Sequence, residues 1–108
     1  DAPTGSGWWH WVVYDIPASA TGLVMGAGAA GGAALPAGAK LGRTDFGTAE
    51  YGGAAPPPGH GPHRYIFTLY ALNTGKLDVP PDASAAMVGF YIHFAKLAQA
   101  QLTATYER

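Results

Sequence analysis

The sequence contains no cysteine, few charged residues and no long apolar run. The absence of cysteine excludes disulfides, Cys-based zinc sites and thiol catalysis, and it leaves the redox compartment undecided. No apolar stretch approaches the roughly 20 residues needed to span a bilayer, because Gly, Pro or polar residues interrupt each one. Lys and Arg total 6 against 7 Asp and Glu, with no basic run that could follow a nucleic-acid backbone. We therefore expect neither a membrane span nor a nucleic-acid partner.

The 108 residues, 48% of them hydrophobic, suit one compact domain over residues 1–108. Aromatic and β-branched residues predict strands over Trp8 to Ile16 and Arg64 to Leu72. Glycine and alanine without periodicity predict a long surface loop from Ser19 to Gly38. Apolar residues at helical spacing predict a helix from Ala85 to Gln99, and alternation then predicts a closing strand from Gln101 to Glu107. The chain is expected to be mostly β with one helix.

Two histidines lie inside aromatic, strand-like segments. Side chains two residues apart in a strand share a face, so His10 is expected to project with Trp8, and His63 with Tyr65. These two pairs could line one pocket that offers hydrogen-bond donors and almost no fixed charge. Such a pocket suits a small anion or a phosphate headgroup better than a cation.

Several motifs follow one another along the chain: Asp1-Ala2-Pro3, Trp8-Trp9-His10-Trp11, Tyr51-Gly52-Gly53 and His63-Arg64-Tyr65. In this order and spacing they resemble the phosphatidylethanolamine-binding protein family, and the bacterial branch of Raf kinase inhibitor-like proteins is the closer match. The resemblance implies an antiparallel β-sandwich with a C-terminal helix. It also implies a small cavity for phosphate-like anions, with no cofactor.

The resemblance also carries a set of candidate ligand-binding residues: Asp1, Pro3, Trp8, His10, Gly53, His63 and Tyr65. Asp1 matches the second acidic residue of the family's Asp-Pro-Asp-Ala-Pro motif, and the first has no counterpart here. Gly52 to Pro58 could form a rigid loop whose backbone amides approach an oxyanion. Arg64 should face away from the pocket, so we interpret it as a structural ion-pair partner.

The function expected first is a binding module for phosphate or phosphorylated headgroups that performs no covalent chemistry and could regulate a partner protein. One alternative is an inhibitor-like interaction protein, of kinase or protease type, that recognises a phosphorylated or acidic side chain. Another is a small esterase or hydrolase, although no Gly-X-Ser-X-Gly elbow is present. No metal site is expected, since the His residues lack ligand spacing. His60 is expected to be solvated, and His93 to lie on the surface.

The sequence begins inside the Asp-Pro-Asp-Ala-Pro motif, and we expect a fold that lacks its N-terminal strands. Strands as apolar as those predicted need a cover, because an unpaired hydrophobic strand is an aggregation site. The expected cover is an N-terminal β segment of the same protein or a second copy in a homodimer. A cytoplasmic location is favoured over a periplasmic one.

Overall fold

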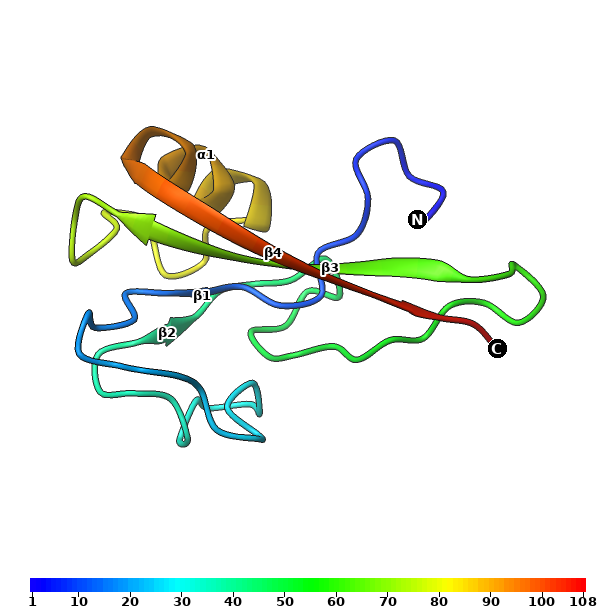
Figure 1. Cartoon of the computed structure of the whole chain (residues 1–108), viewed down its shortest axis with the longest axis horizontal. Coiled ribbons are helices and arrows are strands. Elements are labelled where there is room, and N and C mark those ends of the chain that lie inside the picture. The colour runs from blue at the N-terminus through cyan, green and yellow to red at the C-terminus, as the bar shows by residue number, and fades with distance from the viewer.

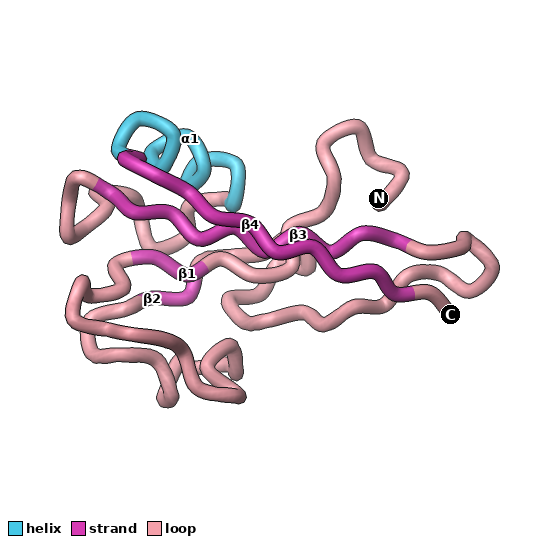
Figure 2. Tube along the Cα trace, in the orientation of Figure 1, coloured by secondary structure: helices cyan, strands magenta, loops and turns pink.

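The computed structural model describes residues 1–108, most of them in loops around two antiparallel strand pairs and one helix (Figure 2). The elements in chain order are β1 (Val13–Tyr14), β2 (Lys40–Leu41), β3 (His63–Leu72), α1 (Ala85–Ala95) and β4 (Lys96–Tyr106). Among the regular elements, strands outnumber the one helix, which confirms the predicted mostly-β class with one helix. The helix lies late in the chain and one strand follows it, in the predicted order. The closed sandwich stays a prediction, because each sheet has two strands.

The long ribbon formed by β3 and β4 runs along the length of the molecule (Figure 1). His63 pairs with Tyr106 at one end and Leu72 with Lys96 at the other, with a register shift between Ala71 and Leu72. Aromatic and β-branched residues favour this strand, as the sequence predicts. The start of β3 therefore lies at one end of the ribbon, next to the loop that leads into it.

Helix α1 begins where the sequence predicts and ends four residues early. The Ser84 hydroxyl caps it by accepting a hydrogen bond from the Met87 amide. At the other end the Lys96 amide still donates to the Ile92 carbonyl, but Lys96 has extended backbone angles. The expected end at Gln99 is wrong because β4 starts at Lys96, where pairing with β3 supplies the backbone hydrogen bonds.

The expected strand from Trp8 to Ile16 is regular β structure only at β1. Its other backbone groups bond to separate loop positions: the Trp9 carbonyl accepts from Asp45, the His10 carbonyl from Gly52, and the Val12 carbonyl from Gly42. The segment is thus paired, but with partners that do not form one continuous strand. This arrangement holds His10 between two loops.

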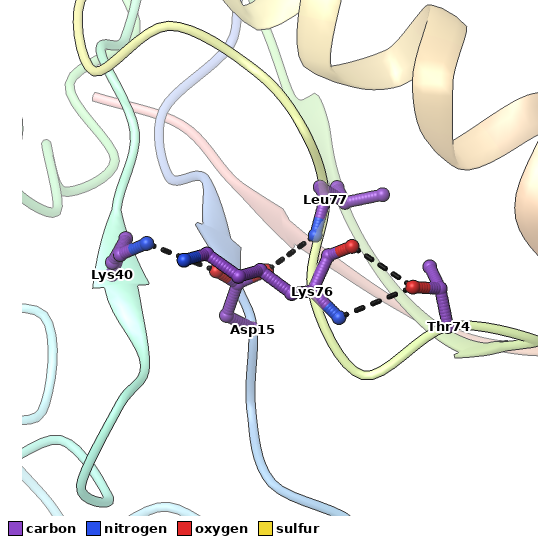
Figure 3. Close-up of polar contacts among 5 residues, drawn as sticks. All are labelled: Asp15, Lys40, Thr74, Lys76 and Leu77. Atoms are coloured by element: carbon purple, nitrogen blue, oxygen red, sulfur yellow. Dashed lines mark hydrogen bonds and ion pairs between the residues drawn. The ribbon is translucent and has the colours of Figure 1, made fainter.

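The core lies between β1, the segment before α1, and α1 itself; it comprises Val12, Tyr14, Leu77, Ala83, Ala85 and Val88. The Asp15 carboxylate stabilises one side of this core. This buried carboxylate accepts a hydrogen bond from the Leu77 amide at 2.7 Å and forms an ion pair with Lys40 at 3.2 Å (Figure 3). Asp15 has φ of 59°, a left-handed conformation that Asp tolerates better than most residues. One carboxylate therefore links three segments distant in sequence.

Much of the ribbon is open to solvent. All eleven residues of β4 are exposed, and Leu69, Leu97 and Leu102 are each at least 67% exposed. The expected covering β segment or second copy stays a prediction. No helix has the length and apolar character needed to cross a membrane. The compartment also stays a prediction.

Candidate functional site

His10 is held by two hydrogen bonds to one residue. Its Nδ1 lies 2.8 Å from the Gly52 carbonyl oxygen, and the Gly52 amide donates to the His10 carbonyl at 2.9 Å. Because a carbonyl only accepts, Nδ1 must carry the proton. The tautomer is thereby set, and Nε2 is left for another partner.

Phe46 lies against the His10 ring, with centroids 5.2 Å apart in an edge-to-face arrangement. It is placed by a tight turn in which its amide donates to the Thr44 hydroxyl, and that hydroxyl donates to the Thr48 carbonyl. Asp45 ties the turn to the chain beside His10, since its carboxylate accepts from the Trp9 amide and its own amide donates to the Trp9 carbonyl. The turn thus positions one wall of the His10 environment.

Four rings from three parts of the chain form a continuous row. Trp8 packs edge-on against Phe46 at 5.5 Å, Phe46 against His10, and His10 against Tyr65 of β3 at 5.3 Å. Trp8 is 42% exposed and lies one ring away from His10. The structure therefore brings His10 and Tyr65 together and places Trp8 at the outer end of the row.

His63 begins β3 two residues before Tyr65 and shares its face of the strand. The residue is 8% exposed. Desolvation lowers the pKa of His63 below its ordinary value, and the positive charge of His60 lowers it further. The imidazole is thus favoured in its neutral form until an anion or another acceptor faces it.

The Asp1 carboxylate is engaged by Arg64. Both carboxylate oxygens lie within 3.0 Å of the guanidinium, and one also accepts from the Arg64 amide at 2.7 Å. This confirms the interpretation of Arg64 as an ion-pair partner. The pair neutralises the acidic group next to the start of β3.

The other candidate residues lie outside this row. Gly53 is exposed, and the backbone contact to His10 comes from Gly52 instead. Pro3 is exposed in the N-terminal turn. The amide of Gly52 is already occupied by His10, so an amide nest at this point has one donor fewer than the sequence suggests.

Sequence reasoning missed Phe46 and the role of Gly52. A Thr-Asp-Phe-Gly turn could have marked Phe46, because Thr and Asp cap turns with their side chains and Gly47 has a positive φ. A cavity of about 290 Å³ contains none of the candidate residues; it is lined by Trp11, Tyr51, Phe67 and loop residues between Val24 and Ala29. No three His, Asp or Glu side chains lie close enough together to hold a metal ion.

The His10 imidazole has a set tautomer and packs against Tyr65, two residues into a strand that begins with a second histidine. This arrangement suits a protein that holds a small polar ligand. The family model described as phosphatidylethanolamine-binding protein matches residues 1–107, and the chain belongs to this family. It is 51% identical to YbcL of Escherichia coli over 107 residues and 55% identical to YbhB of the same species over 106 residues. These matches cover 99% and 98% of the chain.

The fold agrees with a solved structure. The crystal structure of Escherichia coli YbcL, described as a new member of the mammalian PEBP family, superimposes on the whole chain with a TM-score of 0.96 and 51% identity. The chain covers 66% of that structure, 58% of the full YbcL sequence and 66% of YbhB. It thus spans less than two thirds of the length of these relatives.

Proposed function

We propose that the chain binds a small anion, a phosphate or carboxylate group, without covalent chemistry. The residues assigned to the ligand are His10, Tyr65 and His63. The observation that carries the proposal is the hydrogen bond from His10 Nδ1 to the Gly52 carbonyl, because it leaves Nε2 as the only free nitrogen of a ring fixed in position. A protonated imidazole presents Nε2–H to an anion as a charge-assisted donor.

The charges around the site support an anion. The one carboxylate of the candidate set, on Asp1, forms an ion pair with Arg64. Its negative charge is therefore balanced and does not repel a bound anion. The rings around His10 are those of Phe46 and Tyr65, so the imidazole has one phenol beside it. The Asp45 carboxylate on the neighbouring turn accepts a hydrogen bond from the Trp9 amide. A site of this kind offers donors, which is what an oxyanion requires.

The same arrangement favours binding over ester hydrolysis. The hydrogen bond that His10 makes goes to the Gly52 carbonyl and not to a hydroxyl that it could activate, and the Thr44 hydroxyl of the nearby turn donates to the Thr48 carbonyl. Ser84 is engaged as the cap of α1. A phosphorylated partner protein would present the same chemical group as a small phosphate, so the two sources are separated by experiment.

The test is a titration of the full-length protein with inorganic phosphate, phosphoethanolamine and a phosphoserine peptide, followed through the His Cε1–H resonances. Replacing His10 by Ala should weaken phosphate binding by about 1.5–3 kcal/mol, because a hydrogen bond to a charged group is lost. His93→Ala is the matched control, since His93 is exposed on α1. Equal affinities for wild type and His10→Ala, or no binding of any of the three, would contradict the proposal.

A further inference from the structure

His60 is exposed, as predicted, and its ring also lies close to that of a second histidine. It lies at the end of a turn in which its amide donates to the Pro57 carbonyl, and its ring centroid is 5.7 Å from that of His63. Gly59 and Gly61 on either side have φ of 85° and 79°, a conformation that other residues rarely adopt. The two glycines let the chain turn back, so that the imidazoles of residues 60 and 63 face each other.

The turn is also held from the other end of the chain. The Gly59 amide donates to the Arg108 carbonyl at 3.1 Å, and Arg108 Nε donates to the Pro56 carbonyl at 2.8 Å. Pro56 is fully buried, and two further prolines follow it. A loop restrained in this way loses little conformational entropy when a ligand binds between its side chains.

We propose that His60 and His63 form a paired imidazole site that selects doubly charged phosphate monoesters over singly charged anions. This inference rests on the proposed function, because His63 belongs to the anion site and shares a strand face with Tyr65. His60 adds a group that sequence comparison with the family motifs does not assign to the ligand. His60 contributes specificity for the second negative charge of the phosphate monoester.

The physical basis is the lack of a counter-charge for the pair. Among the four histidines, His10 is the one whose ring is hydrogen-bonded to another protein group. The carboxylate of Asp1 is taken by Arg64, and Tyr106 stands opposite His63 in β4. Protonation of both imidazoles is opposed by their mutual repulsion in the free protein, and a dianion bound between them favours it by compensating both charges. A monoanion compensates only one of the two charges.

The experiment compares inorganic phosphate at a pH near 7.5, where it is largely a dianion, with dimethyl phosphate, a monoanion at any neutral pH. Both are titrated into full-length wild type and into H60Q, which keeps a hydrogen-bond donor but cannot become charged. We expect H60Q to lose roughly 3- to 10-fold in phosphate affinity, because the group is near the surface, and to change little towards dimethyl phosphate. H93Q on α1 is the matched control and should leave both affinities unchanged.

The outcomes separate this inference from the proposed function. If wild type and H10A bind phosphate differently while H60Q binds both anions like wild type, the paired site is wrong and the proposed function stands. Equal losses for the two anions in H60Q would also overturn the selectivity. If wild type binds neither anion, both proposals fail together. Dispersed NMR spectra of H60Q, like those of wild type, establish that a loss of binding is not a loss of fold.

Discussion

The two ends of the segment formed by residues 8–14 have different roles, one in the candidate site and one in the core. Residues 8–14 run from the candidate site into the core: Trp8 and His10 belong to the row of rings, and Val12 and Tyr14 belong to the core. Val12 and Tyr14 are 7% and 6% exposed in the core, whereas Trp8 is 42% exposed and His10 half-buried in the row of rings. The difference comes from what packs against each end. Segments around α1 cover the core end, and polar turns and glycines hold the other.

The two ends are also stabilised by different forces. The core end combines apolar burial with the Asp15 carboxylate, whose hydrogen-bonding capacity is used within the protein. The site end is held by backbone and side-chain hydrogen bonds that leave one His10 nitrogen and the Tyr65 ring available. Substitutions at the core end should therefore change stability, and those at the site end should change binding.

The largest expected effect is at Asp15. Asp15→Ala removes the acceptor of the Leu77 amide and the partner of Lys40, and places Ala at a positive φ. We expect the free energy of unfolding to fall by about 3 kcal/mol, measured by urea denaturation. Asp15→Asn keeps an acceptor and tolerates the left-handed conformation, so it should lose about 1 kcal/mol. Similar losses for the two variants would show that the backbone contact to Leu77 is not important.

Val88→Ala tests the core by burial alone. Val88 is 1% exposed, and removing two methyl groups should lower the free energy of unfolding by about 2 kcal/mol. The same substitution at Val24, which is 65% exposed, is the matched control and should change stability by less than about 0.5 kcal/mol. Phosphate affinity should be unchanged in both variants. A loss of affinity in folded Val88→Ala would mean that the two ends are coupled.

Gly52→Ala should separate the site from the core. A Cβ at this position would lie 2.6 Å from Cδ2 of Phe46, so the ring and the carbonyl that orients His10 cannot both stay in place. We expect phosphate affinity to fall about 10-fold, with a stability loss of about 1 kcal/mol. Gly53→Ala is the control, because its Cβ would meet only Tyr51 at 4.0 Å. A larger loss of binding in Gly53→Ala would restore Gly53 as the ligand-site glycine.

The smallest expected effect is a pH dependence of stability from His63. Desolvation, together with the charge of His60, lowers its pKa in the folded state below the ordinary 6.5. The unfolded chain therefore binds more protons between the two pKa values. Stability is complete above about pH 6.5 and is lost as the pH falls through the folded pKa.

Urea unfolding of wild type and His63→Gln from about pH 7.5 to 5 checks this sign. The free energy of unfolding of His63→Gln should fall less at low pH than that of wild type. His93→Gln should keep the wild-type profile. A wild-type stability that rises as the pH falls over this range would contradict the expected direction. The same lowered pKa predicts that anion binding, after correction for the ligand's own ionisation, strengthens as the pH falls, since protonation of His63 then accompanies binding.

Local sequence signals predicted some elements closely. Arg64 to Leu72 is β-rich in composition, and the strand observed is His63–Leu72. Ser84 marked the start of α1 because its hydroxyl can satisfy a helical amide that has no partner in the helix. The end of α1 was missed because it depends on the pairing of Lys96 with Leu72 of β3, 24 residues away in sequence. Local propensity carries no information about that partner.

The candidate site shows the same division. The spacing of His10 and of His63 with Tyr65 already indicated which side chains share a face, and the motifs indicated the family. Phe46, Gly52 and His60 were not assigned, since their roles depend on contacts between residues distant in sequence or on a turn closed by Arg108. The pairing of the Asp1 carboxylate with Arg64 was not predicted either, because the two residues lie 63 positions apart.

By itself, the sequence determined the family, the composition of the strands and the cap of the helix, because these follow from residue type and short-range spacing. Only the tertiary structure decided which nitrogen of His10 is free, which glycine touches it, and which imidazole stands beside His63. Those properties depend on the direction of hydrogen bonds and on ring contacts between chain segments. Directional contacts of this kind form only when the segments pack together, so they cannot be predicted from residue type and short-range spacing.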